Sequence, residues 1–210
     1  MHSIFYRNGD TRRVSSDHWL DLFDTEQFSA AIFDCDGTLV ESSAAHLQAM
    51  QSAARDQGAD MPADWYQTRT GLDRTGLFRE FAATLQTPFN VDQACEVSIA
   101  KFADAVSLVK PITPVLEFAV ALKTRDIPLA VGTNAEGCVA RRSLAAAAPK
   151  DLFSQIISIS DGVRPKPSPD IFELAAKRLG VGPSQVLVIE DSPQGVDAAK
   201  AAGMSVIGLI

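Results

Sequence analysis

Apolar and polar residues follow one repeated pattern through the second half of the chain. From residue 111 onward, short apolar runs alternate with longer segments whose apolar residues recur at helical spacing. Such alternation is typical of a parallel sheet that carries helices on both faces. It predicts an α/β core with a doubly wound, Rossmann-like sheet. We expect strands at residues 127–132, 155–159, 186–189 and 205–209, and helices at residues 115–123, 135–147, 169–179 and 193–202.

Residues 44–110 have a different, largely helical pattern. Helices are expected at residues 44–57, 75–85 and 92–109. Because this block separates the first predicted strand from the second, we expect it to form an inserted helical cap domain. The α/β core then consists of residues 28–43 and 111–210.

Residues 1–27 precede the first predicted strand. Two strand-like stretches flank Asn8-Gly9, a dipeptide that favours the tight turn of a β-hairpin, and a short helix is expected at residues 17–23. The segment carries no motif for chemistry. We therefore expect an N-terminal extension that packs on the core, with the hairpin covering an otherwise open edge of the sheet.

Composition narrows the choice of partner and compartment. The chain has 210 residues, of which 46% are hydrophobic, and a formal net charge of -7 at pH 7. This charge argues against nucleic acid or an anionic membrane as a partner. Cys35, Cys95 and Cys138 show neither metal-ligand spacing nor a disulfide framework, which favours the cytoplasm. The polar N-terminus does not resemble a signal peptide, and no apolar run is long enough to span a bilayer. The sequence does not determine the oligomeric state.

Two carboxylates directly follow the first apolar strand. Asp34 and Asp36 flank Cys35 in the sequence FDCDGTL. Residues two apart in an extended strand point to the same side, so both acids can face one pocket. Two like charges this close are costly unless a cation lies between them or one acid takes up a proton. The pair therefore predicts a metal site that also performs acid–base chemistry.

Polar residues also follow the later predicted strands. Thr133 and Asn134 come after the second strand, and Lys166 lies in the proline-flanked loop after the third. Glu190 and Asp191 follow the fourth. The carboxyl ends of parallel strands meet at one edge of the sheet, where ligands bind. Carboxylates there can hold a divalent cation, hydroxyl and amide groups can hold phosphate oxygens, and a lysine offsets negative charge, so phosphoryl transfer is expected.

Four segments resemble the ordered motifs of the haloacid dehalogenase-like (HAD) hydrolase superfamily. They read FDCDGTLVES, VGTN, RPKPSPDIF and VIEDSPQG, and the resemblance covers roughly residues 28–209. The helical insert resembles the cap of the phosphoglycolate phosphatase and β-phosphoglucomutase branch. The resemblance implies a Mg²⁺-dependent phosphatase that hydrolyses a small phosphorylated metabolite, of the sugar phosphate or phosphoglycolate type, through an aspartyl-phosphate.

The resemblance assigns a role to each acid. Asp34 matches the nucleophile that attacks phosphorus, and Asp36 matches the general acid and base. The metal set implied for Mg²⁺ comprises Asp34, the backbone carbonyl of Asp36, Asp191, and Glu190 directly or through water. Dehalogenases lack a second acid at the position of Asp36, so phosphoryl transfer is favoured over carbon–halogen cleavage.

The resemblance also assigns the phosphate-binding groups. Thr133 matches a catalytic hydroxyl that binds phosphate, and Lys166 matches the lysine that stabilises negative charge. Asn134 is the neighbouring substrate-binding residue. Each has a plainer alternative: Thr133 could cap a helix, and Lys166 could be a solvated surface lysine.

Two residues of the helical insert are candidate substrate contacts. His46 and Arg74 match positions where a β-phosphoglucomutase contacts its sugar phosphate, and Lys101 has a similar spacing. His46 could instead be a hinge or core residue, and Lys101 a solvated lysine. We expect specificity to come from this insert, mainly from the loop at residues 70–76.

A mutase is the alternative to a phosphatase. The positions of His46, Arg74 and Lys101 favour it. In contrast, Thr133-Asn134-Ala135 departs from the mutase sequence, and Glu136 places a negative charge where a mutase has lysine. We therefore expect a phosphatase, and the identity of its substrate is not determined by the sequence.

Overall fold

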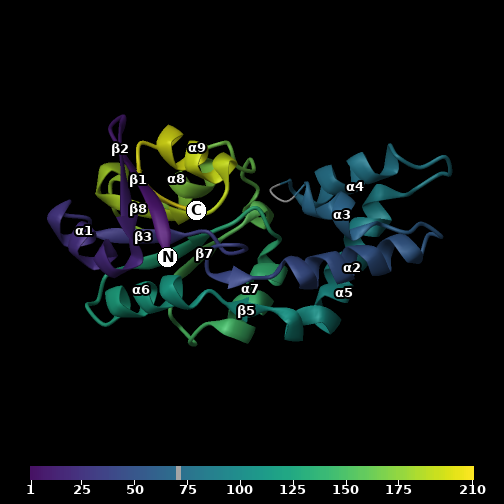
Figure 1. The fold of residues 1–210 in the computed structure, drawn as a ribbon, viewed down its shortest axis with the longest axis horizontal. Coiled ribbons are helices and arrows are strands. Elements are labelled where there is room, and N and C mark those ends of the chain that lie inside the picture. The colour runs from purple at the N-terminus through teal and green to yellow at the C-terminus, as the bar shows by residue number, and fades with distance from the viewer. Residues whose placement is uncertain (70–71) are drawn as a thin grey trace. The chain divides into compact units, whose positions relative to one another are not determined.

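The chain folds into two units, shown as ribbons in Figure 1. The structure is a computed structural model, and it describes residues 1–69 and 72–210. Met1–Glu41 and Pro111–Ile210 form the first unit, and Ser42–Lys110 forms the second. The second unit is thus an insertion into the first.

A largely parallel sheet forms the centre of the first unit. Its strands are β1 (His2–Arg7), β2 (Asp10–Ser15), β3 (Ala30–Phe33), β6 (Leu129–Gly132), β7 (Gln155–Ile157), β8 (Val186–Glu190) and β9 (Ser205–Leu209). Within the described residues they lie in the order β2-β1-β9-β8-β3-β6-β7. The strands from β9 to β7 run parallel, whereas β1 and β2 are antiparallel additions at one edge. The predicted α/β fold class is confirmed.

Helices cover both faces of this sheet (Figure 1). They are α1 (Trp19–Thr25), α6 (Thr113–Lys123), α7 (Gly137–Ala147), α8 (Asp170–Leu179) and α9 (Pro193–Ala201). Ile32 of β3 packs with Phe172 of α8 on one face. Phe33, the next residue, contacts Phe118 of α6, with ring centres 6.1 Å apart. Successive side chains of a strand point to opposite faces, which explains why this short strand is apolar throughout.

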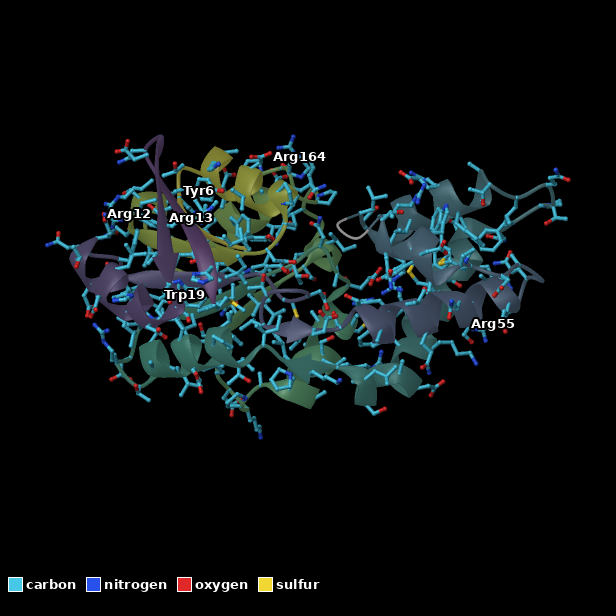
Figure 2. The ribbon with its side chains drawn as sticks, viewed as in Figure 1. Tyr6, Arg12, Arg13, Trp19, Arg55 and Arg164 are labelled. Carbon is cyan, nitrogen blue, oxygen red and sulfur yellow. The ribbon has the colours of Figure 1, made fainter. Side chains whose placement is uncertain are left out.

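The N-terminal segment forms a hairpin on the edge of the sheet. Asn8 and Gly9 both have positive φ, 51° and 89°, as the tight hairpin turn requires. β1 pairs with β9 and so covers its outer edge. Below the hairpin, Trp19 is fully buried and its Nε1 donates to Ser3 Oγ at 3.0 Å (Figure 2).

The second unit is helical and has its own apolar core. Its helices are α2 (Ser43–Arg55), α3 (Ala63–Gln67), α4 (Arg74–Ala82) and α5 (Val91–Ala105). Met50, Met61 and Phe78 are among the residues buried in this core. Two short strands at the boundaries of the insertion, β4 (Val40–Glu41) and β5 (Lys110–Pro111), pair in a separate sheet; β4 and Pro111 belong to the first unit. Among the described residues, no helix is long and apolar enough to cross a membrane.

Several element boundaries differ from the expected ones. The strand expected at 155–159 ends at Ile157, because Ser158 and Asp161 instead form a capping box on a 3-10 turn over Ile159–Asp161. The helix expected at 92–109 ends at Ala105 and continues as a 3-10 turn. α3 was not anticipated by the sequence pattern.

Candidate active site

Asp34 lies at the carboxyl end of the central strand β3. Its backbone N–H donates to the carbonyl oxygen of Ile189 in β8 at 2.9 Å, so parallel pairing holds the chain up to this residue. The chain then turns at Gly37, whose φ is 89° and whose N–H donates to the carbonyl of Val40 at 2.7 Å. Asp34 is 7% exposed, whereas Asp36 is half-buried in the turn. The two acids, separated by one residue in the motif, therefore occupy different surroundings.

The ammonium group of Lys166 lies between two carboxylates. Its Nζ donates to Asp34 Oδ1 at 2.5 Å and to Glu190 Oε1 at 2.7 Å, and it lies 4.8 Å from the centre of the Phe172 ring. Burial alone would lower the pKa of Lys166, but the charges of Asp34 and Glu190 outweigh this effect and raise it. Lys166 is therefore charged at neutral pH and offsets negative charge at this edge of the sheet.

Glu190, the last residue of β8, has both carboxylate oxygens engaged. Oε1 accepts from Lys166, and Oε2 accepts from the backbone N–H and the hydroxyl of Ser192, at 2.6 and 2.9 Å. A Cβ at Gly195 would lie 1.9 Å from Glu190 Oε1. Gly195 is therefore required to leave room for this carboxylate.

Asp191 follows Glu190 and faces the first motif. Its Oδ1 accepts from the hydroxyl of Thr38 at 2.9 Å. A Cβ at Gly37 would lie 2.1 Å from Asp191 Oδ2, so a second glycine makes room for a second acid. Partial burial of the carboxyl group, together with the charge of Glu190, raises the pKa of Asp191 to about 6. Part of the residue nevertheless remains exposed to solvent.

The chemistry of these acids fits a hard divalent cation. Asp34, Glu190 and Asp191 each offer a carboxylate oxygen, and these oxygens lie within 4.8 Å of one another. Carboxylate oxygens are the ligands that Mg²⁺ prefers in proteins. Burial raises the pKa of Asp34 well above its ordinary value, and Glu190 and Asp191 add to the rise while Lys166 opposes it. The cluster thus holds more negative charge than one lysine balances, and a cation would stabilise it.

Thr133 and Asn134 follow β6 at the same edge of the sheet. Thr133 is 2% exposed, and its Oγ1 accepts from the N–H of Ala135 at 3.0 Å. Asn134 contacts the backbone of Lys166 twice: Oδ1 accepts from its N–H at 2.8 Å, and Nδ2 donates to its carbonyl at 3.3 Å. The structure therefore joins the second and third motifs through Asn134.

The candidate residues of the helical insert belong to the second unit. The ring of His46 lies 4.7 Å from that of Phe102, in line with the alternative of a core histidine. Arg74 is 7% exposed, and its Nη1 donates to Ser98 Oγ at 3.0 Å. Of the predicted specificity loop, Thr70 and Gly71 lie outside the described residues. Substrate contacts by His46 and Arg74 stay predictions.

Comparison with known proteins decides the family. A model described as haloacid dehalogenase-like hydrolase matches residues 31–209. The chain belongs to the haloacid dehalogenase-like hydrolase family. The predicted resemblance is therefore confirmed.

Three known proteins show which members of the HAD family this chain resembles. It is 29% identical to fructose-1-phosphate phosphatase YqaB of Escherichia coli, over 87% of this chain and 96% of that protein. It is 26% identical to β-phosphoglucomutase of Bacillus subtilis, over 86% and 82%. A HAD family hydrolase from Deinococcus radiodurans, solved with bound phosphate and sodium, is 32% identical with a TM-score of 0.64, covering 86% and 80%. Relatives of this kind over most of the chain support a phosphomonoester hydrolase.

Two polar residues of this HAD site were missed in the sequence. Thr38 supports Asp191, and Ser192 supports Glu190. A signal for Ser192 was available, because Ser192 directly precedes Pro193 at the first turn of α9 and its hydroxyl caps that helix by accepting from Gly195 N–H at 3.1 Å. No local signal identified Thr38, since its partner is 153 residues away.

Proposed function

We propose that the protein is a Mg²⁺-dependent phosphatase that hydrolyses a small phosphorylated metabolite through an aspartyl-phosphate at Asp34. One observation carries the proposal: the Asp34 carboxylate lies at the end of the central strand with Lys166 at 2.5 Å and Asp191 in the same acidic cluster. A carboxylate held in this way can act as a nucleophile while its surroundings offset the charge of a phosphate. The cytoplasmic location expected from the cysteines belongs to the same proposal.

The reaction proceeds in two displacements at phosphorus. An oxygen of Asp34 attacks the phosphate ester, the bond from phosphorus to the ester oxygen breaks, and Asp36 gives its proton to the departing alkoxide. Asp36, now a base, takes a proton from water, which attacks the aspartyl-phosphate. The bond between phosphorus and Asp34 breaks, and inorganic phosphate leaves. The sum is one ester and one water converted to one alcohol and one phosphate.

The remaining residues support the charges of this reaction. Lys166 balances negative charge on Asp34 and on the phosphate, and the buried hydroxyl of Thr133 is the proposed donor to a phosphate oxygen. Asp34, Asp36, Glu190 and Asp191 are the groups that would hold Mg²⁺. When bound, Mg²⁺ shields the repulsion between carboxylate and phosphate dianion.

The helical insert is the proposed cap. Two relatives of the chain act on sugar phosphates, as their names fructose-1-phosphate phosphatase and β-phosphoglucomutase state. We infer a substrate of similar size, with His46 and Arg74 as candidate contacts to the part of the substrate distant from the reacting phosphate. Closure of such an insert over the core would exclude bulk water during the first displacement.

The proposal is tested with p-nitrophenyl phosphate as a generic substrate. Wild-type protein with Mg²⁺ should release p-nitrophenol, and EDTA or the substitution Asp34→Asn should abolish the release. Asp10→Asn, in the exposed hairpin, is the matched control and should retain full activity. Equal turnover by wild-type and Asp34→Asn proteins would exclude Asp34 as the nucleophile.

A mutase is distinguished by its product. β-Glucose 1-phosphate incubated with protein and Mg²⁺ should give inorganic phosphate if the protein is a phosphatase. Conversion to glucose 6-phosphate would instead assign it to the β-phosphoglucomutase activity of its Bacillus relative. Glu136, at the N-cap of α7, places a negative charge where a mutase has lysine, and this favours release of inorganic phosphate.

A further inference from the structure

The side chain of Asn134 pairs with both backbone polar groups of one residue. Oδ1 of Asn134 accepts from the N–H of Lys166 at 2.8 Å, and Nδ2 donates to the carbonyl of Lys166 at 3.3 Å. Two hydrogen bonds from one planar amide fix the orientation of the Lys166 backbone as well as its position. A residue on an adjacent β-strand would pair with the N–H and the carbonyl of Lys166 in the same way.

Other contacts in the loop around Lys166 do not involve its own N–H and carbonyl: Ser168 N–H donates to the carbonyl of Pro165 at 3.0 Å, and Arg164 N–H donates to Asp170 Oδ2 at 3.3 Å. Pro165, Pro167 and Pro169 have no N–H to donate, so Lys166 is one of the few donors in the segment. The segment forms neither helix nor strand between Gly162 and Asp170. The contact with Asn134 acts directly on the backbone of Lys166, as the ladder hydrogen bonds would for a lysine on a strand.

The position of the Lys166 backbone determines where its ammonium group lies. Nζ must reach Asp34 and Glu190 together, at 2.5 and 2.7 Å, and the side chain is only 3% exposed. A long side chain placed so tightly depends on the location of its own Cα. Movement of the loop would break at least one of these two contacts.

We propose that Asn134 is a positioning residue that holds Lys166 for the reaction, rather than a ligand of the substrate phosphate. The proposal rests on the phosphatase function proposed above and deepens it. It changes the role expected from the sequence, because Oδ1 and one N–H of the Asn134 amide are engaged with the Lys166 backbone. The second N–H of Nδ2 is the group that a role in phosphate binding would use, so substrate and phosphate affinities separate the two roles.

Kinetics of Asn134→Ala separate the two roles. A misplaced Lys166 reduces stabilisation of the transition state, so kcat should fall by about 100-fold while KM stays within about threefold of wild type. The inhibition constant of inorganic phosphate should likewise stay within about threefold. A rise in KM and in the phosphate inhibition constant, with kcat retained, would overturn the proposal and make Asn134 a ligand.

Asn90→Ala is the matched control. Asn90 caps α5 in the second unit, where its Oδ1 accepts from the N–H of Gln93 at 3.0 Å. Both substitutions remove an asparagine that accepts a backbone N–H, so both should lower the melting temperature. Only Asn134→Ala should lower kcat. An equal fall of kcat in both variants would show a general effect of lost stability and refute the positioning role.

Hydrogen exchange tests the contact without turnover. The Lys166 amide should be protected in wild-type protein and exchange at least about tenfold faster in Asn134→Ala, whereas the Ser158 amide, bound to Asp161, should not change. Loss of protection in a protein without phosphatase activity would reject the proposed function and retain the contact. Unchanged protection of Lys166 would reject the positioning role itself.

Discussion

Lys166 and Asp34 are 132 residues apart in the sequence, yet the lysine ammonium donates to the aspartate at 2.5 Å. The same ammonium donates to Glu190, so one buried cation serves the proposed nucleophile and a second acid. Buried charges of this kind are tolerated only when they are paired. The stability of the site and its chemistry therefore depend on the same three side chains.

Replacing Lys166 by methionine should destabilise the protein. The substitution leaves the buried carboxylates of Asp34 and Glu190 without their cation, which typically costs about 3–5 kcal/mol. Urea unfolding at pH 7.5 measures the loss. Adding Glu190→Gln to the variant removes one of the unpaired charges and should restore part of the stability. A double variant less stable than Lys166→Met alone would contradict this account of the cluster.

Replacing Gly195 by alanine should displace Glu190. The new Cβ would lie 1.9 Å from Glu190 Oε1, so the carboxylate and the Lys166 that it holds must move. We expect a loss of about 1–3 kcal/mol, as for other overpacked sites, and a fall in kcat.

Gly182→Ala provides the control for this substitution. Its Cβ would meet Gln185 Oε1 at 3.6 Å, an ordinary contact, and its φ of -74° suits alanine. This variant should be unchanged or more stable by about 0.4–1 kcal/mol. Because alanine is favoured over glycine by about 1 kcal/mol within a helix such as α9, a Gly195→Ala protein more stable than wild type would show that Glu190 is not constrained there.

Mg²⁺ should raise the melting temperature through Asp191. A ligand that binds only the folded protein stabilises it by about 2.7 kcal/mol at 100 times its Kd. Asp191→Asn removes one charge from the cluster while keeping an oxygen that can accept from Thr38, so the fold should persist and the Mg²⁺-induced shift should vanish. Thermal scans with and without EDTA measure both proteins. An undiminished shift in Asp191→Asn would place the ion elsewhere.

The Asp161 carboxylate should make stability depend on acid pH. Burial alone would raise its pKa, but hydrogen bonds from Ser158 N–H and Arg178 outweigh this effect and lower it. An acid with a lowered pKa stabilises the fold above its unfolded pKa of about 3.9, and this contribution is lost as pH falls through the lower folded value. The urea midpoints of wild type and Asp161→Asn should therefore differ at pH 7 and converge below pH 4. A constant difference across this range would contradict the assignment.

Residues within single motifs were predictable from the sequence. Asp34 and Asp191 lie at the ends of apolar runs and Lys166 lies in the loop after another strand, and parallel strands bring their ends to one edge, so their grouping could be expected. The Asn8-Gly9 dipeptide likewise predicted the hairpin between β1 and β2. Contacts made by a side chain across long sequence separations were not predictable, as Thr38 with Asp191 and Asn134 with Lys166 show.

The sequence by itself determined the α/β class, the inserted helical segment and the residue types at each strand end. These follow from local periodicity and from motifs a few residues long, which reflect backbone geometry directly. Only the tertiary structure decided that Lys166 lies between Asp34 and Glu190, and that Asn134 contacts the Lys166 backbone. Those contacts depend on where a proline-rich loop lies beside two strand ends, and that placement is set by packing among distant segments rather than by any local preference of the chain.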